Sequence, residues 1–141
     1  MEFIKKQNMP DSEALKAYNE GYYIEALQII HSFIENQCQS YLMLVGSVNF
    51  GANLSETWDF ADTLTLHNCL KVLFILNKIS KEEYEIHNKL NTLRNKVIHN
   101  IYKEPYEKNY SGISKTEYDS VFNESIEYLY FFTRKAEDLV E

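Results

Sequence analysis

The chain is poor in the residues that interrupt helices, with only four glycines and two prolines among its 141 residues. An all-β sandwich or barrel needs many tight turns and usually contains more of both residue types. This scarcity argues against such folds and favours long helices. The length suggests one domain, and it is sufficient to bury a hydrophobic core without disulfides or metal ions.

Cysteine is also scarce, and Cys38 and Cys69 have no second cysteine at the spacing of a redox or metal-binding motif. We expect both to be reduced core residues of a cytosolic protein. The N-terminal residues contain no hydrophobic run of the kind that a signal peptide has. The most apolar stretch, LKVLFILNKI from Leu70, is too short to span a bilayer. We therefore expect a cytoplasmic protein that does not associate with membranes.

Positive charge is limited: 14 lysines and arginines stand against 21 acidic residues, for a net charge of −7. The only arginines are Arg94 and Arg134. Proteins that bind nucleic acid non-specifically usually present a basic face to the phosphates. The overall field of this chain should repel a polyanion, so we expect no DNA binding. Any contact with RNA requires a small, local basic cleft.

Apolar residues recur at helical spacing along most of the chain. This pattern predicts a short first helix up to Gly21 and long helices over residues 22–46, 61–80, 80–103 and 114–141. Gly46 is the predicted end of the second helix, and residues 48–63 are predicted to be a loop with one helical turn at most. Ser80 with Glu83, and Ser114 with Glu117, have the spacing of a capping box.

Most of the predicted connections are short, so neighbouring helices should pack antiparallel. The sequence therefore predicts an all-α fold with a single domain over residues 1–141. The expected arrangement is an up-and-down four-helix bundle with an extra short N-terminal helix.

The stretch RNKVIHN, residues 94–100, lies near the end of the helix predicted over residues 80–103. The apolar face of this helix is formed by Ile86, Leu90, Leu93, Val97 and Ile101. His87, Asn91, Asn95 and His99, spaced four apart, form a polar stripe that drifts round to the far side. At about 100° per residue, Arg94 lies on the shoulder of the apolar face and His99 roughly opposite Leu90.

Arg94 and His99 are therefore roughly 140° apart on an ideal helix and do not share one face. One ligand can contact both if Arg94 swings round, if the helix is distorted, or if a second copy of the helix lies nearby. The last option predicts a symmetric homodimer with the site at its two-fold axis.

These residue types suit RNA cleavage with the 2′-hydroxyl as internal nucleophile, a reaction that needs no metal. His99 can transfer protons near neutral pH, and Arg94 offers a planar, permanently charged fork to phosphate. Asn95 can hold the imidazole or a phosphate oxygen. The plain alternative is a solvated arginine and an exposed histidine that is favourable at the end of a helix.

Lys89, Lys96, Lys103 and Lys108 surround the stretch. They could form the local basic cleft that the acidic chain otherwise lacks, and they are equally consistent with solvated helix faces. We take Lys96 and Lys103 as candidate substrate-binding residues, together with Tyr102, because aromatic rings can stack on bases.

His31 and Glu35 are one helical turn apart, and with His67 they could hold a metal ion. No known ligand spacing is completed, so a hydrogen bond between His31 and Glu35 on the helix surface is the better interpretation. The sequence also contains no Walker loop, dinucleotide fingerprint, HExxH motif or serine elbow. We therefore predict neither a metal site nor a cofactor.

At Arg94, Asn95 and His99 the chain resembles the HEPN superfamily. The signature of that superfamily is an arginine and, after four to six residues, a histidine near the end of a long helix, often with a polar residue directly after the arginine. The segment EGYYIEALQIIHSFIENQCQSYL is similar to an early helical segment of many HEPN domains. Members with a nucleotidyltransferase antitoxin carry a tyrosine two residues beyond the histidine. That position is Ile101 here, and Tyr102 follows it.

The resemblance implies a four-helix bundle that forms a homodimer with a shared cleft. Many members are metal-independent ribonucleases, often toxins or anti-phage effectors. By position, Arg94 and His99 would be catalytic and Asn95 supporting. The expected function is thus endoribonuclease, with RNA as substrate and any antitoxin or regulator acting in trans. The alternatives are a non-catalytic HEPN-like module that binds a nucleotide or a protein, and a plain helical interaction protein.

Overall fold

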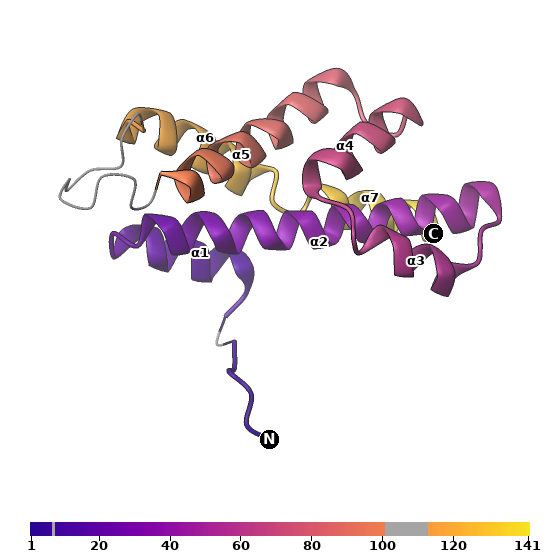
Figure 1. Ribbon diagram of the computed structural model, residues 1–141, viewed down its shortest axis with the longest axis horizontal. Helices are drawn as coiled ribbons and strands as arrows, with labels where there is room; N and C mark the ends of the chain where they lie inside the picture. The colour runs from indigo at the N-terminus through magenta and orange to yellow at the C-terminus, as the bar shows by residue number, and fades with distance from the viewer. Residues whose placement is uncertain (7, 101–112) are drawn as a thin grey trace.

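The computed structural model describes residues 1–6, 8–100 and 113–141, which form seven α-helices and no strand (Figure 1). The helices are α1 (Pro10–Asn19), α2 (Tyr23–Phe50), α3 (Leu54–Ala61), α4 (Leu66–Ile75), α5 (Lys81–His99), α6 (Lys115–Glu127) and α7 (Phe131–Val140). The predicted all-α class is therefore confirmed. None of the described helices combines the length and apolar character that a membrane span requires.

The long helix α2 is the axis of the fold, and it packs against each of the other six helices. Figure 1 shows α1 folded back along the first half of α2, α3 along its second half, and α5 running over its upper side. One side of α2 is buried along its length: Ala26 and then Leu27, Ile30, Ile34, Cys38, Tyr41 and Val45, which follow one another at steps of three or four residues. This spacing turns an apolar stripe towards the core, as the sequence predicts.

The predicted end of the second helix, at Gly46, is wrong. The helix α2 continues to Phe50, and Gly51 follows it in the left-handed conformation, with a φ of 70°. Gly46 lies against α3 instead, where an added Cβ would be 3.2 Å from the Thr57 Cγ2 atom. The absence of a side chain at Gly46 therefore serves the close approach of two helices rather than helix termination.

The loop predicted over residues 48–63 contains the helix α3, which is two turns long. The Asn53 side chain begins this helix by accepting a hydrogen bond from the Glu56 N–H at 3.0 Å. The helix predicted over residues 61–80 is shorter than expected and is reduced to α4, which starts after Thr65 as the N-cap. The end predicted for the following helix, at Pro105, lies outside the described residues.

The helix predicted over residues 114–141 is divided into α6 and α7 at residues 128–130. Ser114 caps α6 as predicted, by accepting a hydrogen bond from the Glu117 N–H at 3.0 Å. The division allows Phe132 to pack against Tyr41 of α2, with ring centroids 6.1 Å apart, and against His87 of α5, at 4.8 Å. Packing across the core therefore takes precedence over the continuity of the helix.

The core combines large side chains from all parts of α2 and from α4 to α7. Its fully buried members include Leu27, Ile30, Ile34, Leu70, Leu90, Phe122 and Phe132. Cys38 and Cys69 are both buried and free, as predicted, and burial raises the pKa of the Cys38 thiol well above its usual range. Both residues therefore act as small core side chains.

The left-handed conformation of Gly51 makes a specific prediction for stability. Gly51→Ala is expected to lower the free energy of unfolding by about 1 kcal/mol, because a Cβ is unfavourable at positive φ. No atom lies within 4 Å of the added Cβ among the described residues, so the cost should come from the backbone alone. Urea unfolding of wild type, Gly51→Ala and Gly51→Asn measures this cost. Asparagine should cost less, and equal stability of wild type and the alanine variant would contradict the prediction.

Candidate functional site

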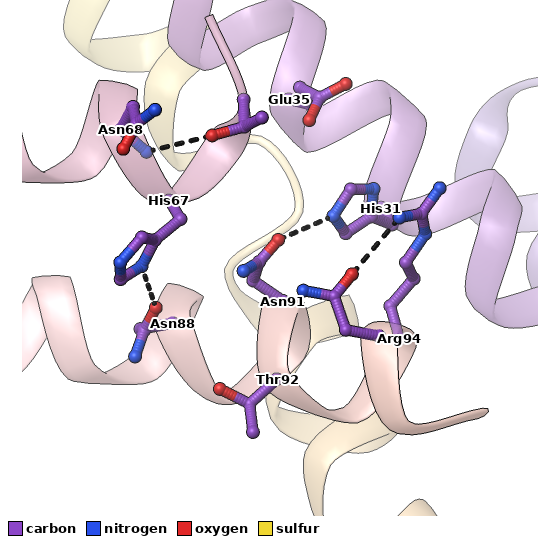
Figure 2. Close-up of a pocket in the computed structure, with 10 residues that line it drawn as sticks. His31, Glu35, His67, Asn68, Asn88, Asn91, Thr92 and Arg94 are labelled. Atoms are coloured by element: carbon purple, nitrogen blue, oxygen red, sulfur yellow. Dashed lines mark hydrogen bonds between the residues drawn. The ribbon is translucent and has the colours of Figure 1, made fainter. Parts of the chain in front are cut away.

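A pocket of about 500 Å³ lies between α2, α4 and α5 (Figure 2). All ten described residues that line it are polar: two histidines, four asparagines, two threonines, one glutamate and one arginine. The arginine is Arg94, and no lysine is among these ten. The pocket is therefore rich in hydrogen-bonding groups and has one permanent positive charge.

Arg94 is half-buried on α5, in agreement with its predicted place on the shoulder of the apolar face. Its Nε donates a hydrogen bond to Gln28 Oε1 on α2 at 3.1 Å, and its Nη1 donates one to Asn95 Oδ1 at 3.1 Å. These two bonds hold the guanidinium at the wall of the pocket. A guanidinium has five N–H donors, so donors remain for a phosphate or carboxylate oxygen.

His31 of α2 lies beside Arg94 and is only 3% exposed. Its Nε2 is 3.1 Å from Asn91 Oδ1 on α5. Because the amide oxygen can only accept, Nε2 carries the proton and Nδ1 carries the lone pair of the neutral ring. Burial lowers the pKa of His31, and the Arg94 charge adds to this effect, whereas the Asn91 bond and the Glu35 charge oppose it. His31 is therefore a neutral imidazole near pH 7.

His67 of α4 and Glu35 of α2 line the side of the pocket nearer α4. The His67 Nδ1 atom is 2.9 Å from Asn88 Oδ1, and Glu35 Oε2 accepts a hydrogen bond from the Leu66 N–H at 2.9 Å. That N–H is one of the first of α4, which have no partner within the helix, so Glu35 stabilises the positive end of α4. The partners of Glu35 and His31 thus lie on other helices.

The predicted surface hydrogen bond between His31 and Glu35 is therefore replaced by bonds across the pocket. In the part of the chain that the structure describes, no three His, Cys, Asp or Glu residues come together as a group that could hold a metal ion. What the pocket offers is a tethered arginine and two imidazoles, each with one nitrogen bound to an asparagine of α5.

The structure brings two of the three predicted catalytic residues into this pocket. Arg94 and Asn95 line it, whereas His99 is the last residue of α5, exposed and outside the pocket. The predicted separation of Arg94 and His99 around the helix accounts for this placement. Within one chain, the histidines near Arg94 are His31 and His67.

The predicted polar stripe on this helix is buried at its first two residues and accessible at its last two. His87 and Asn91 are buried, because α5 packs against α2, α4 and α6 rather than against one neighbour only. His87 contacts aromatic rings of the C-terminal segment, among them Phe131 at 5.2 Å between centroids. Only Asn95 and His99, nearer the end of α5, are partly or fully accessible.

The lysines that the structure describes near the motif lie beside carboxylates of α6. Lys96 Nζ is 3.3 Å from Glu117 Oε2, and Lys89 Nζ is 3.8 Å from Glu124 Oε1. Such exposed pairs contribute little to stability, but they offset the positive charge locally. For these two lysines the ion pairs favour solvated helix faces over a basic cleft. Three further candidates lie outside the described residues: Tyr102, Lys103 and Lys108.

Sequence reasoning did not identify Gln28, Asn88 or Asn91 as site residues. A signal for the asparagines is present, because Asn88, Asn91 and Asn95 are three and four residues apart and so share one face of α5. Gln28 gives no such signal, because it lies 66 residues from its partner Arg94 in the sequence.

No family model, no curated protein and no solved structure matches the chain. The pocket and its residues are therefore the features from which a function can be inferred.

Proposed function

We propose that the chain is a metal-independent endoribonuclease of the HEPN type, acting as a homodimer in the cytoplasm in a toxin or anti-phage role. The observation that carries this proposal is the guanidinium of Arg94, held by Gln28 and Asn95 at the wall of a polar pocket. An arginine fixed before substrate binds can stabilise a transferring phosphate without reorganising. Asn95 has the supporting role in this scheme, since it orients Arg94.

In the proposed reaction, the 2′-oxygen of a ribose attacks the adjacent phosphorus and the 5′-oxygen leaves. The products are a 2′,3′-cyclic phosphate and a 5′-hydroxyl end. Arg94 stabilises the negative charge on the phosphate oxygens, and histidine transfers the protons. His99 is exposed at the end of α5, where a second protomer can reach it. The four-helix bundle and any antitoxin or regulator acting in trans belong to this same proposal.

A homodimer with the two α5 ends next to each other would place Arg94 of one protomer near His99 of the other. In this arrangement Arg94 and His99 can contact one RNA substrate, although they lie on different sides of α5, and the helix does not have to be distorted. The predicted roles of Lys96, Lys103 and Tyr102 in RNA binding remain predictions.

The second candidate is a non-catalytic HEPN-like module that binds a nucleotide or a partner protein. The position of His99 favours it, because a single chain does not bring this histidine into the Arg94 pocket. Such a module would bind its ligand through Arg94 and the asparagines of the pocket, and it would leave RNA uncut.

RNA cleavage in EDTA tests the proposal. Purified wild-type protein is expected to cut single-stranded RNA under these conditions, and His99→Ala is expected to lower the rate by about 10²-fold through loss of proton transfer. Far-UV circular dichroism checks that the variant is folded. Intact RNA after incubation with wild-type protein would favour the non-catalytic module.

Mixed dimers test whether the site is shared. A dimer of one Arg94→Ala and one His99→Ala protomer retains one intact pair, so mixing the two inactive variants should restore about a quarter of wild-type cleavage. Absence of restoration, with subunit exchange verified, would contradict the shared site. Each variant mixed with itself is the control.

A further inference from the structure

The pocket beside Arg94 contains a histidine that does not belong to the stretch RNKVIHN. His31 comes from α2, and Figure 2 shows its ring between Asn91 and the head of Arg94. We propose that His31 Nδ1 is the general base that accepts the 2′-hydroxyl proton of an RNA substrate whose phosphate is held by Arg94 of the same protomer. This inference rests on the proposed ribonuclease function.

The hydrogen bond from His31 to Asn91 sets the chemistry of the ring. Asn91 Oδ1 accepts from Nε2, so the neutral ring has its lone pair on Nδ1. The bond also fixes the ring plane, because Asn91 lies on α5 and His31 on α2, two helices that pack together. A base oriented by a third group is a recurring feature of catalytic sites that activate a hydroxyl.

The charged groups around His31 keep it in the form that a base requires. On its own helix, Glu35 raises the pKa of His31, but its carboxylate is engaged by the Leu66 N–H. From α5, the Arg94 charge lowers the pKa, as does burial, which is the largest cause. From α4, His67 lines the same pocket and is bound to Asn88. The ring is thus neutral near pH 7 and can accept a proton.

Groups from two protomers supply the proton acceptor and the proton donor that the reaction needs. The 2′-hydroxyl proton moves to His31 Nδ1 as the bond between the 2′-oxygen and phosphorus forms. The bond between phosphorus and the 5′-oxygen breaks, and that oxygen takes a proton from His99 of the second protomer. His31 then returns its proton to water and His99 regains one from water. Arg94 stabilises the charge on the phosphate throughout.

Kinetics of RNA cleavage in EDTA against pH test this role. His31→Gln is expected to lower kcat by about 10²-fold with little change in KM, and the fall in rate at acid pH should disappear with the base. Asn91→Asp is expected to move this acid limb to higher pH, because a carboxylate stabilises the imidazolium. A residue with a purely structural role would not move the limb.

A matched control is His87→Leu, which replaces another buried histidine that lies outside the pocket and should keep the cleavage rate and the pH profile at wild-type values. Folded His31→Gln protein with wild-type kcat and acid limb would overturn the inference, and so would an unmoved limb in Asn91→Asp. A third outcome separates the two proposals: wild type and His31→Gln cut RNA, and Arg94→Ala does not. That result refutes the role of His31 and leaves the proposed ribonuclease function standing. Wild-type protein that leaves RNA intact refutes the proposed function, and the role of His31 with it.

Discussion

Arg94→Ala is expected to lower kcat/KM for RNA cleavage by about 10³-fold, which is the scale for removing a preorganised charge from a phosphoryl-transfer site. Arg94 is the only permanent cation among the described residues that line the pocket. Among the described residues that line the pocket, no other side chain can therefore replace its charge. The measurement is single-turnover cleavage of a labelled RNA in EDTA.

Two further variants show whether the geometry of Arg94 matters in addition to its charge. Arg94→Lys keeps the charge but loses the planar fork that bonds to Gln28 and Asn95, so we expect a loss of about 10²-fold. Arg134→Ala removes the only other arginine, which is exposed on α7, and should cleave as wild type does. Equal losses in the Arg94→Ala and Arg134→Ala variants would indicate a general charge effect and contradict the role of the pocket.

Acid is expected to destabilise the protein through His87 by about 3 kcal/mol between pH 6.5 and pH 4. The imidazole of His87 is surrounded by aromatic side chains, and the residue is only 1% exposed. Its Nε2 has no hydrogen-bond partner among the described residues. Burial lowers the pKa of His87 from 6.5 to about 4, a change that the charge of Glu83 only partly opposes.

The direction of this effect follows from the two proton affinities of His87. The unfolded chain binds the proton near pH 6.5, and the folded chain does so only near pH 4. Above pH 6.5 both states are neutral and the histidine adds no pH dependence. As the pH falls from 6.5 to about 4, the unfolded state is protonated first, so the free energy of unfolding decreases; below about pH 4 the loss is complete. The lowered pKa of His31 acts in the same direction.

Urea unfolding from pH 7 to pH 4 measures this dependence in wild type and in His87→Leu. The variant should lose less stability across the range, because leucine does not titrate. At pH 7 it should be about 1 kcal/mol more stable than wild type, since it removes a buried nitrogen without a partner. Parallel pH curves for the two proteins would contradict the assignment to His87.

Two features of α5 were predicted correctly from the sequence, its start and its apolar face. Its start was predicted correctly, because Ser80 and Glu83 form a capping box within four residues of each other. Its apolar face was also predicted correctly at Ile86, Leu90 and Val97, which are all buried. Both features depend on spacing along one helix.

The errors occur where distant packing overrides local pattern. Gly46 was predicted to end a helix, but it lies against Thr57 and leaves α2 intact. The last predicted helix divides at residues 128–130, where Phe132 turns towards Tyr41. Neither contact could be inferred from periodicity, because each joins two helices whose relative position is set by the whole core.

The candidate site also has features that the sequence predicted and features that depend on tertiary packing. The sequence alone determined that Arg94 lies on the shoulder of α5 and that His99 lies far round the same helix, because the 100° turn per residue fixes both angles. Only the tertiary structure decided which groups surround Arg94: Gln28 and His31 from α2, and His67 from α4. These positions depend on how three helices pack, and the residues that meet there are far apart in the chain.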